Sequence, residues 1–225
     1  MVKSVGTDSL RMRKDNRVEN KSMTNICLTS AYLAPVAYYS ALAKAEIAYV
    51  EQCDYYVKQT YRNRCHIAAA NGVMVLSIPV EKASTEKLLT KDVRISEHND
   101  WQMNHWRSIE SAYNSTPFFE YYKDDLYIYY EKKWKFLLDF NLEIQAKILE
   151  LLELEPKIIL TEEYKIQTAE NVQDLRERIH PKKENSLAEE CKPYYQVFEQ
   201  RFGFQPNLSV IDLLFNMGNE AQLII

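Results

Sequence analysis

The chain has 225 residues, of which 46% are hydrophobic, and a formal net charge of −4. It contains only 4 glycines, where average usage would give about 16, and they stand isolated as Gly6, Gly72, Gly203 and Gly218. Neither GxGxxG nor GxxxxGK[ST] is therefore present, which argues strongly against the phosphate-binding loops of Rossmann folds and P-loop NTPases.

Net charge and cysteine spacing further restrict the classes of protein to which the chain can belong. The pI near 5.7 argues against a broad nucleic-acid-binding surface and allows only local basic clusters. The 4 cysteines show no CxxC spacing, so we expect free thiols in a reducing cytoplasm. No apolar run is long enough to span a membrane. We interpret the polar segment 1–22 as a disordered tail and 23–225 as a single domain.

The first elements indicate an α/β fold. Asn25–Ser30 and Ile47–Glu51 are predicted strands, and Pro35 opens a predicted helix from Val36 to about Ala45 between them. A strand, a helix and a second strand in this order indicate a parallel pair with a right-handed crossover.

The dipeptide Asn71-Gly72 then gives the strongest hairpin signal in the chain. It separates two predicted strands, Tyr61–Ala70 and Val73–Val80. If the dipeptide forms a two-residue turn, Ala70 faces Val73, and the rest of the pairing follows from that register.

A row of cationic side chains follows from this hairpin. Arg62, Arg64 and His66 would share one strand face, about 6.6 Å apart, because strand side chains alternate. Two guanidiniums so placed suit a phosphate or a carboxylate. The alternative is a solvated sheet face on which Arg62 pairs with Glu81 across the strands.

The remainder of the chain is predicted to be mainly helical. We expect a small mixed sheet with an N-terminal βαβ unit and a β-hairpin, followed by a mostly helical second half. Lys165–Pro193 is polar and weakly patterned, and we expect a long loop or a partly disordered segment there. The other predicted elements are a short strand at Asp92–Ser96, helices at Trp101 to about Asn114, Phe118–Tyr130, Lys133 to Leu154 and Ser209–Met217, and a short extended piece at Thr161–Tyr164.

Two amides interrupt the apolar stripe of the helix expected at Lys133 to Leu154. At 100° per residue, Asn141 and Gln145 fall among its apolar side chains. A buried amide without partners costs roughly 1–3 kcal/mol. Either this pair bonds to the backbone and holds a loop, or it lines a pocket.

His105 and Asp212 each have a chemical and a structural interpretation. His105 shares a helix face with Trp101 and is either a general acid or base or an ordinary hydrogen-bonding residue. Ser209 and Asp212 have the spacing of a capping box, which favours a structural role for Asp212. There is no HExxH, and the 4 histidines lack ligand spacing, so we expect no metal site.

An ordered series of short segments resembles the WbqC-like protein family of bacteria. The match is distributed over about Met23 to Ala221, and no single motif carries it. The matching segments are Tyr32-Leu33-Ala34-Pro35, Val50-Glu51-Gln52, Gln59-Thr60-Tyr61-Arg62-Asn63-Arg64, Leu76-Ser77-Ile78-Pro79-Val80, Trp101 with His105-Trp106, Asn141-Leu142, and Pro206-Asn207 through Met217-Gly218.

The resemblance implies a role in surface-polysaccharide (O-antigen-like) biosynthesis. We expect a cytoplasmic enzyme, a transferase that acts on a nucleotide-sugar or related anionic metabolite and needs no cofactor. His105 or Asp54 would move a proton. The candidate substrate-binding residues are Tyr32, Arg62, Asn63, Arg64, Trp101, Asn141 and Asp212.

One departure from the family pattern supports a second hypothesis. Many members carry His-Gln-Pro where this chain has Leu28-Thr29-Ser30. No nucleophile motif is present either. The alternative is therefore a non-catalytic binding or scaffold protein that associates with glycan-assembly enzymes and exposes an apolar patch.

Overall fold

The computed structural model describes residues 24–82, 87–97, 99–182 and 191–225, so the tail expected at 1–22 lies outside the described residues. Its fold is the mixed α/β architecture expected from the sequence. A four-stranded parallel sheet has the order β5-β2-β1-β6, and a separate two-stranded sheet pairs β3 with β4. The strands are β1 (Thr24–Thr29), β2 (Ala45–Glu51), β3 (Arg64–Ala69), β4 (Gly72–Ser77), β5 (Lys157–Leu160) and β6 (Val172–Asp174).

The N-terminal βαβ unit is confirmed. The helix α1 (Val36–Lys44) follows Pro35, and it connects β1 to the parallel strand β2. Ile26 and Leu28 of β1 pair with Ala48 and Val50 of β2. These four apolar side chains are buried on one face of the sheet, which explains the strand signal in both segments.

Strands β5 and β6 differ from the expectation. The extended piece predicted at Thr161–Tyr164 lies earlier, at Lys157–Leu160, and β6 forms inside the segment 165–193 that we expected to be a loop. Both are short strands that pair with β2 and β1, more than a hundred residues earlier in the chain. Their strand character therefore depends on partners that the local sequence does not contain.

The hairpin exists, but its predicted register is wrong. Ala69 pairs with Gly72 and Arg64 with Ser77, so the pairing is displaced by two residues along the strands. A two-residue Asn-Gly turn needs positive φ at both residues. Here Gly72 has φ +106°, whereas Asn71 does not have a positive φ. The turn therefore contains Ala70 and Asn71, and Gly72 begins β4.

The helical second half is confirmed with shifted ends. The long helix begins at Leu137 instead of Lys133, because Lys135 and Leu137 form backbone hydrogen bonds to the extended segment at Val93 and Ile95. That segment forms isolated bridges instead of the predicted strand. The α-helices after the hairpin are α2 (Trp101–Tyr113), α3 (Phe119–Glu131), α4 (Leu137–Leu151), α5 (Glu199–Phe202) and α6 (Val210–Met217).

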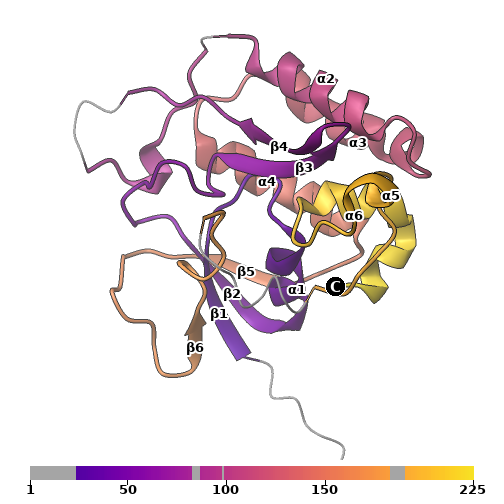
Figure 1. The fold of residues 1–225 in the computed structure, drawn as a ribbon. Coiled ribbons are helices and arrows are strands. Elements are labelled where there is room, and N and C mark those ends of the chain that lie inside the picture. The colour runs from indigo at the N-terminus through magenta and orange to yellow at the C-terminus, as the bar shows by residue number, and fades with distance from the viewer. Residues whose placement is uncertain (1–23, 83–86, 98, 183–190) are drawn as a thin grey trace, which may run out of the picture.

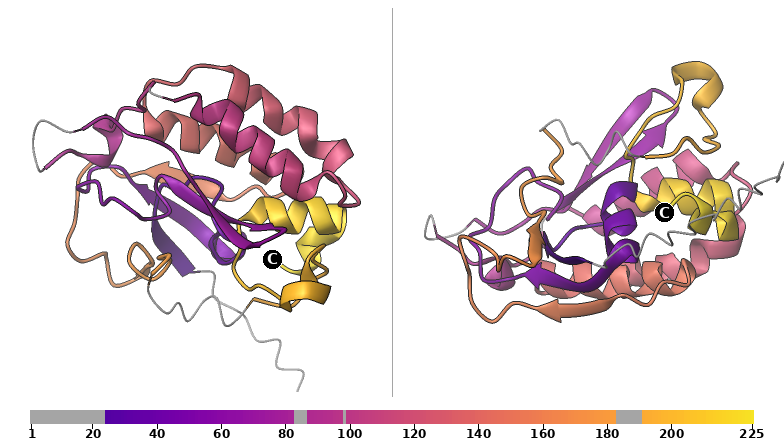
Figure 2. Two further views of the ribbon diagram at one scale, coloured as in Figure 1. Left: turned by 45° about the horizontal axis from the view of Figure 1, so that its top comes forward. Right: turned by 90° about the horizontal axis from the view of Figure 1, so that it is seen from below.

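The two sheets lie on different sides of a shared helical core. Figure 1 shows the hairpin against α2 and α6, with the four-stranded sheet below it. Seen from below, the hairpin and the four-stranded sheet lie on opposite sides of α1 and α6 (Figure 2). Within the described residues, no helix is long and apolar enough to cross a membrane.

Candidate functional site

The segment between β2 and β3 carries the polar groups that we consider first. All four strands of the parallel sheet run the same way, so they end at one edge. Ligands of open parallel sheets commonly bind outside this carboxyl edge. The chain leaves β2 at Glu51 and enters β3 at Arg64, and it carries Asp54, Tyr56 and Arg62 in between.

Arg62 occupies a different place from the one predicted. It precedes β3, so the expected strand face of Arg62, Arg64 and His66 is wrong for Arg62. Arg62 also does not pair with Glu81: its Nη2 donates to Asp54 Oδ2 in an ion pair whose side chains are 4% and 11% exposed. Thr90 Oγ1 donates to the other carboxylate oxygen, Oδ1, at 2.5 Å. Asp54 therefore holds Arg62 in one orientation.

Three donors next to this ion pair find no acceptor in the part of the chain that the structure describes. Within the described part of the chain, Arg62 Nε, Arg64 Nε and the Tyr56 hydroxyl are buried without a hydrogen-bond partner. Burial raises the pKa of Tyr56 to about 12, although Arg62 and Arg64 act against this shift. The hydroxyl is therefore protonated at neutral pH and is a donor. We call Tyr56, Arg62 and Arg64 the arginine cluster.

Two asparagines support the cluster from the protein side. Asn63 Nδ2 donates to the Ile78 carbonyl at 2.9 Å. Asn141 Nδ2, from α4, donates to the Arg62 carbonyl at 2.8 Å and to Ser30 Oγ at 3.3 Å. Asn141 therefore bonds to backbone, as one of the two interpretations expected, whereas Gln145 Nε2 donates to the side-chain hydroxyl of Tyr38 at 3.4 Å. The Oδ1 atoms of Asn63 and Asn141 are both buried without a partner in the described residues.

Tyr32, Trp101 and His105 lie together in the core. The Tyr32 hydroxyl is 3.0 Å from His105 Nδ1 and 2.8 Å from the Tyr130 hydroxyl, and the rings of Trp101 and His105 are 5.2 Å apart. Burial lowers the pKa of His105 to about 4, although a hydrogen bond to the Ser77 backbone acts against this shift. His105 is therefore neutral at pH 7. Its role in proton transfer stays a prediction.

Asp212 is fully buried, and its expected capping role is wrong. Ser209 occupies the cap position of α6, but its hydroxyl donates to the Leu33 carbonyl at 2.7 Å instead. The Asp212 carboxylate accepts hydrogen bonds from three groups of the protein: the hydroxyls of Tyr113 at 2.9 Å and Tyr194 at 2.8 Å, and Gln196 Nε2 at 3.0 Å. Burial still raises its pKa to about 6.

Tyr56 and Thr90 belong to this site although no sequence pattern indicated them. Tyr56 belongs to the pair Tyr55-Tyr56, and its proximity in sequence to Arg62 and Arg64 was the available signal. Thr90 gave no local signal, because it meets Asp54 across 36 residues of sequence. Among the described residues, no group of three or more His, Cys, Asp or Glu side chains could hold a metal ion.

Fold and site together define an α/β protein with a cluster of buried donors at the carboxyl edge of a parallel sheet. The WbqC-like protein family matches residues 30–185, and the chain belongs to this family. It is 23% identical over 220 residues to "Uncharacterized protein Rv1507c" of Mycobacterium tuberculosis. The aligned region covers 85% of this chain and 93% of the relative. No solved structure matches the chain significantly.

Proposed function

We propose that this WbqC-like protein binds a phosphorylated metabolite at the arginine cluster. The ligand class that we favour is a nucleotide-sugar or a related anionic compound. The observation that carries the proposal is a set of three buried donors that have no acceptor among the described residues: Arg62 Nε, Arg64 Nε and the Tyr56 hydroxyl. Buried polar groups are nearly always paired, so an unpaired set is a candidate ligand site.

The charges of the cluster favour an anion over a neutral ligand. Asp54 balances the charge of Arg62. Arg64 makes no ion pair among the described residues and leaves one positive charge uncompensated. Guanidinium groups bind phosphate oxygens through directed, charge-assisted hydrogen bonds. Side chains are the expected donors, because the chain lacks a glycine-rich backbone loop.

In this proposal the protein is a cytoplasmic transferase of surface-polysaccharide biosynthesis, as the family resemblance implies. Arg62 and Arg64 would hold the phosphate and stabilise charge on a leaving group. Asp54 and Thr90 would keep Arg62 oriented, which makes Asp54 a positioning residue. His105 would have to exchange its proton through Tyr32, which is its hydrogen-bonding neighbour.

Calorimetry and thermal shift with UDP-glucose, GDP-mannose, UDP and inorganic phosphate test the proposal. A ligand at 100 times its Kd should stabilise the protein by about 2.7 kcal/mol. We expect Arg64→Gln to weaken binding at least about tenfold, since a charge-assisted hydrogen bond is worth roughly 1.5–3 kcal/mol. Arg107→Gln, a change at an exposed arginine of α2, is the control and should bind as wild type.

Unchanged affinity of Arg64→Gln for every ligand that binds would overturn the assignment of the site. Absence of binding by wild type across the panel would overturn the choice of nucleotide-sugars and phosphate as the ligand class. Turnover of a bound nucleotide-sugar with an added acceptor, followed by release of the nucleotide, tests transferase activity separately from binding.

One observation favours the scaffold alternative. Three consecutive apolar residues of the short strand β4, Val73, Met74 and Val75, are 48%, 41% and 47% exposed. An exposed apolar strand is a common site of protein association. If this is the function, Val75→Lys should abolish binding to a glycan-assembly enzyme, while Val57→Lys in the loop before β3 should not.

A further inference from the structure

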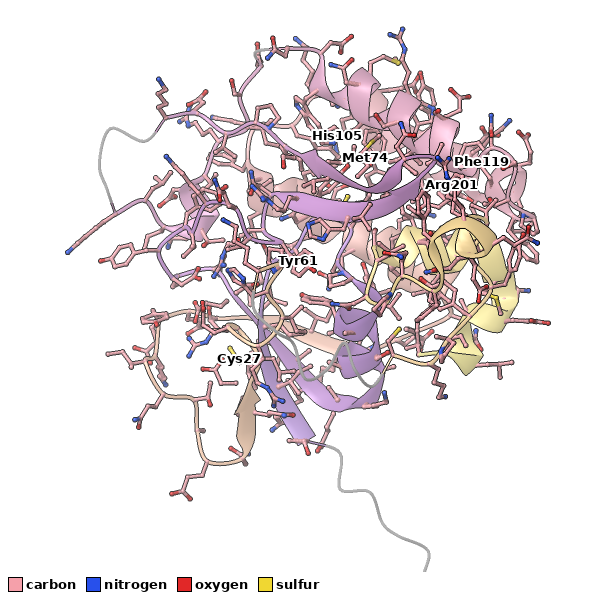
Figure 3. The ribbon with its side chains drawn as sticks, in the orientation of Figure 1. Cys27, Tyr61, Met74, His105, Phe119 and Arg201 are labelled. Carbon is pink, nitrogen blue, oxygen red and sulfur yellow. The ribbon has the colours of Figure 1, made fainter. Side chains whose placement is uncertain are left out.

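A cavity of about 660 Å³ lies on the outer face of the four-stranded sheet. Cys27, Tyr49 and Ile159 form a row across three neighbouring strands, because Cys27 pairs with Tyr49 and Tyr49 with Ile159. None of the three belongs to the main hydrophobic core, which covers the opposite face. Figure 3 shows Cys27 on this sheet, well below His105 and Met74.

The covering of this face is unusual for a parallel sheet. Parallel sheets are normally buried on both faces, usually by helices. Here residues 161–171, which connect β5 to β6 without any helix, line the cavity over the outer face. Figure 1 shows this orange connection leaving β5 and reaching β6 at the other edge of the sheet. Among the residues that the structure describes, this face is therefore covered by a single layer of chain with a cavity beneath it.

A buried ion pair fixes one wall of the cavity. Glu51 is 1% exposed, and its Oε2 accepts from Arg176 Nη1 at 3.1 Å. Its Oε1 accepts from Thr161 Oγ1 at 2.7 Å. Arg176 also donates to the carbonyls of Lys165 at 2.9 Å and Ile166 at 3.3 Å. The connection is thus tied to the sheet, and the cavity is preformed, as ligand pockets usually are.

The lining combines an apolar floor with a polar rim. The Tyr49 ring, Ile159 and Cys27 supply the floor, and burial raises the pKa of Cys27 to about 11, which keeps its thiol neutral. Hydroxyl, amide and carboxylate groups surround this floor. The polar rim consists of Thr161, Glu162, Glu163, Lys165, Thr168 and Asn171.

The charges of this lining disfavour a phosphate. The guanidinium of Arg176 is already bonded to Asp174 and Glu51. Lys165 pairs with Glu163 at 2.9 Å. Glu162 makes no ion pair among the described residues, so the rim has a carboxylate available to accept hydrogen bonds. A ligand with many donors and no negative charge fits these groups.

We propose that this cavity binds a carbohydrate ring that carries no phosphate. The C–H face of the sugar would pack on the Tyr49 ring, and its hydroxyls would donate to Glu162 and exchange hydrogen bonds with Thr168 and Asn171. This second site goes beyond the anion-binding site of the proposed function. Its role as the site of the acceptor substrate rests on that proposal, because a transferase needs a second substrate besides its anionic donor. It shares no lining residue with the arginine cluster, so either site can fail without the other.

Saturation-transfer NMR with D-glucose, D-glucosamine and glucose 1-phosphate tests this proposal. We expect both unphosphorylated sugars to receive saturation from the wild-type protein. Tyr49→Leu should weaken their binding by about 2- to 12-fold, because ring stacking contributes roughly 0.5–1.5 kcal/mol. Tyr121→Leu is the matched control, since Tyr121 is 73% exposed on α3, and it should leave the signal unchanged.

A second variant keeps the test independent of folding defects in the sheet. Glu162 is exposed, so Glu162→Lys should fold normally and reduce glucosamine binding more than glucose binding. Thermal melts of all variants establish that each is folded. Equal signals from wild type and Tyr49→Leu, absence of any sugar signal, or a preference for glucose 1-phosphate that survives Arg64→Gln would each overturn the proposal.

Discussion

Arg62 and Asp54 form an ion pair that is buried on both sides, with side-chain exposures of 4% and 11%. Thr90 completes the hydrogen bonding of the carboxylate, and Asn141 holds the Arg62 carbonyl. The pair therefore connects the loop after β2 with η1 (Thr90–Asp92) and α4. It positions the Arg62 Nε that we assign to ligand binding.

Removal of one partner of this pair should strongly destabilise the folded protein. We expect Asp54→Ala to lower the free energy of unfolding by about 3–5 kcal/mol, because it leaves the charge of Arg62 buried and unpaired. The double variant Asp54→Leu with Arg62→Met should recover most of that loss, since no buried charge remains. Urea denaturation measures both values.

The exposed ion pair of Lys123 and Glu120 provides the control, because its side chains are 33% and 73% exposed. Glu120→Ala should change stability by less than about 1 kcal/mol. An Asp54→Ala effect as small as this control would show that the Arg62–Asp54 pair does not hold the loop.

His105 and Asp212 should change the free energy of unfolding in opposite directions as pH falls, over nearly the same pH range. Burial lowers the pKa of His105 from 6.5 to about 4, so only the unfolded chain gains this proton as pH falls, and stability decreases. Burial raises the pKa of Asp212 from 3.8 to about 6, so the folded state gains that proton first, and stability increases. The two contributions should largely cancel between pH 7 and pH 4.5.

Single variants should separate these contributions. Relative to wild type, His105→Gln should make the change in stability from pH 7 to pH 4.5 more favourable by about 2 kcal/mol. Asp212→Asn should make the same change less favourable by a similar amount. Urea titrations at the two pH values provide the measurement. Identical pH profiles for wild type and both variants would contradict the burial assigned to these groups.

The end of α6 requires glycine for two reasons. Gly218 has φ +56°, and a Cβ added there would lie 2.6 Å from ring atoms of Phe118. Gly203 has φ +70°, but an added Cβ would meet no atom within 4 Å. We expect Gly203→Ala to cost about 1–3 kcal/mol from backbone strain alone.

Gly218→Ala should cost more than Gly203→Ala, by about 1–3 kcal/mol, because the Phe118 ring must also move. Thermal or urea denaturation of the two variants provides the comparison. Equal losses would mean that the Phe118 ring adjusts without cost and that only the backbone conformation matters.

Local sequence patterns determined much of the fold of this protein. Pro35 and the apolar pairs of β1 and β2 specify the βαβ unit, and the apolar stripes specify α2, α3, α4 and α6. These elements depend on residues close together in sequence, where the side-chain period and the helix-starting residue give a direct signal. The burial of Asn141 also followed from its position within such a stripe.

Only the tertiary structure determines which residues meet in the candidate sites. β5 and β6 are strands because β2 and β1 offer them backbone partners, and residues 135–137 stay extended because they pair with 93–95. Arg62 precedes β3, and its partner is Asp54 of the same connecting segment instead of Glu81 across the hairpin. Hydrogen bonds and ion pairs between segments far apart in the sequence select one of several locally acceptable arrangements. No single segment of the sequence specifies which arrangement forms.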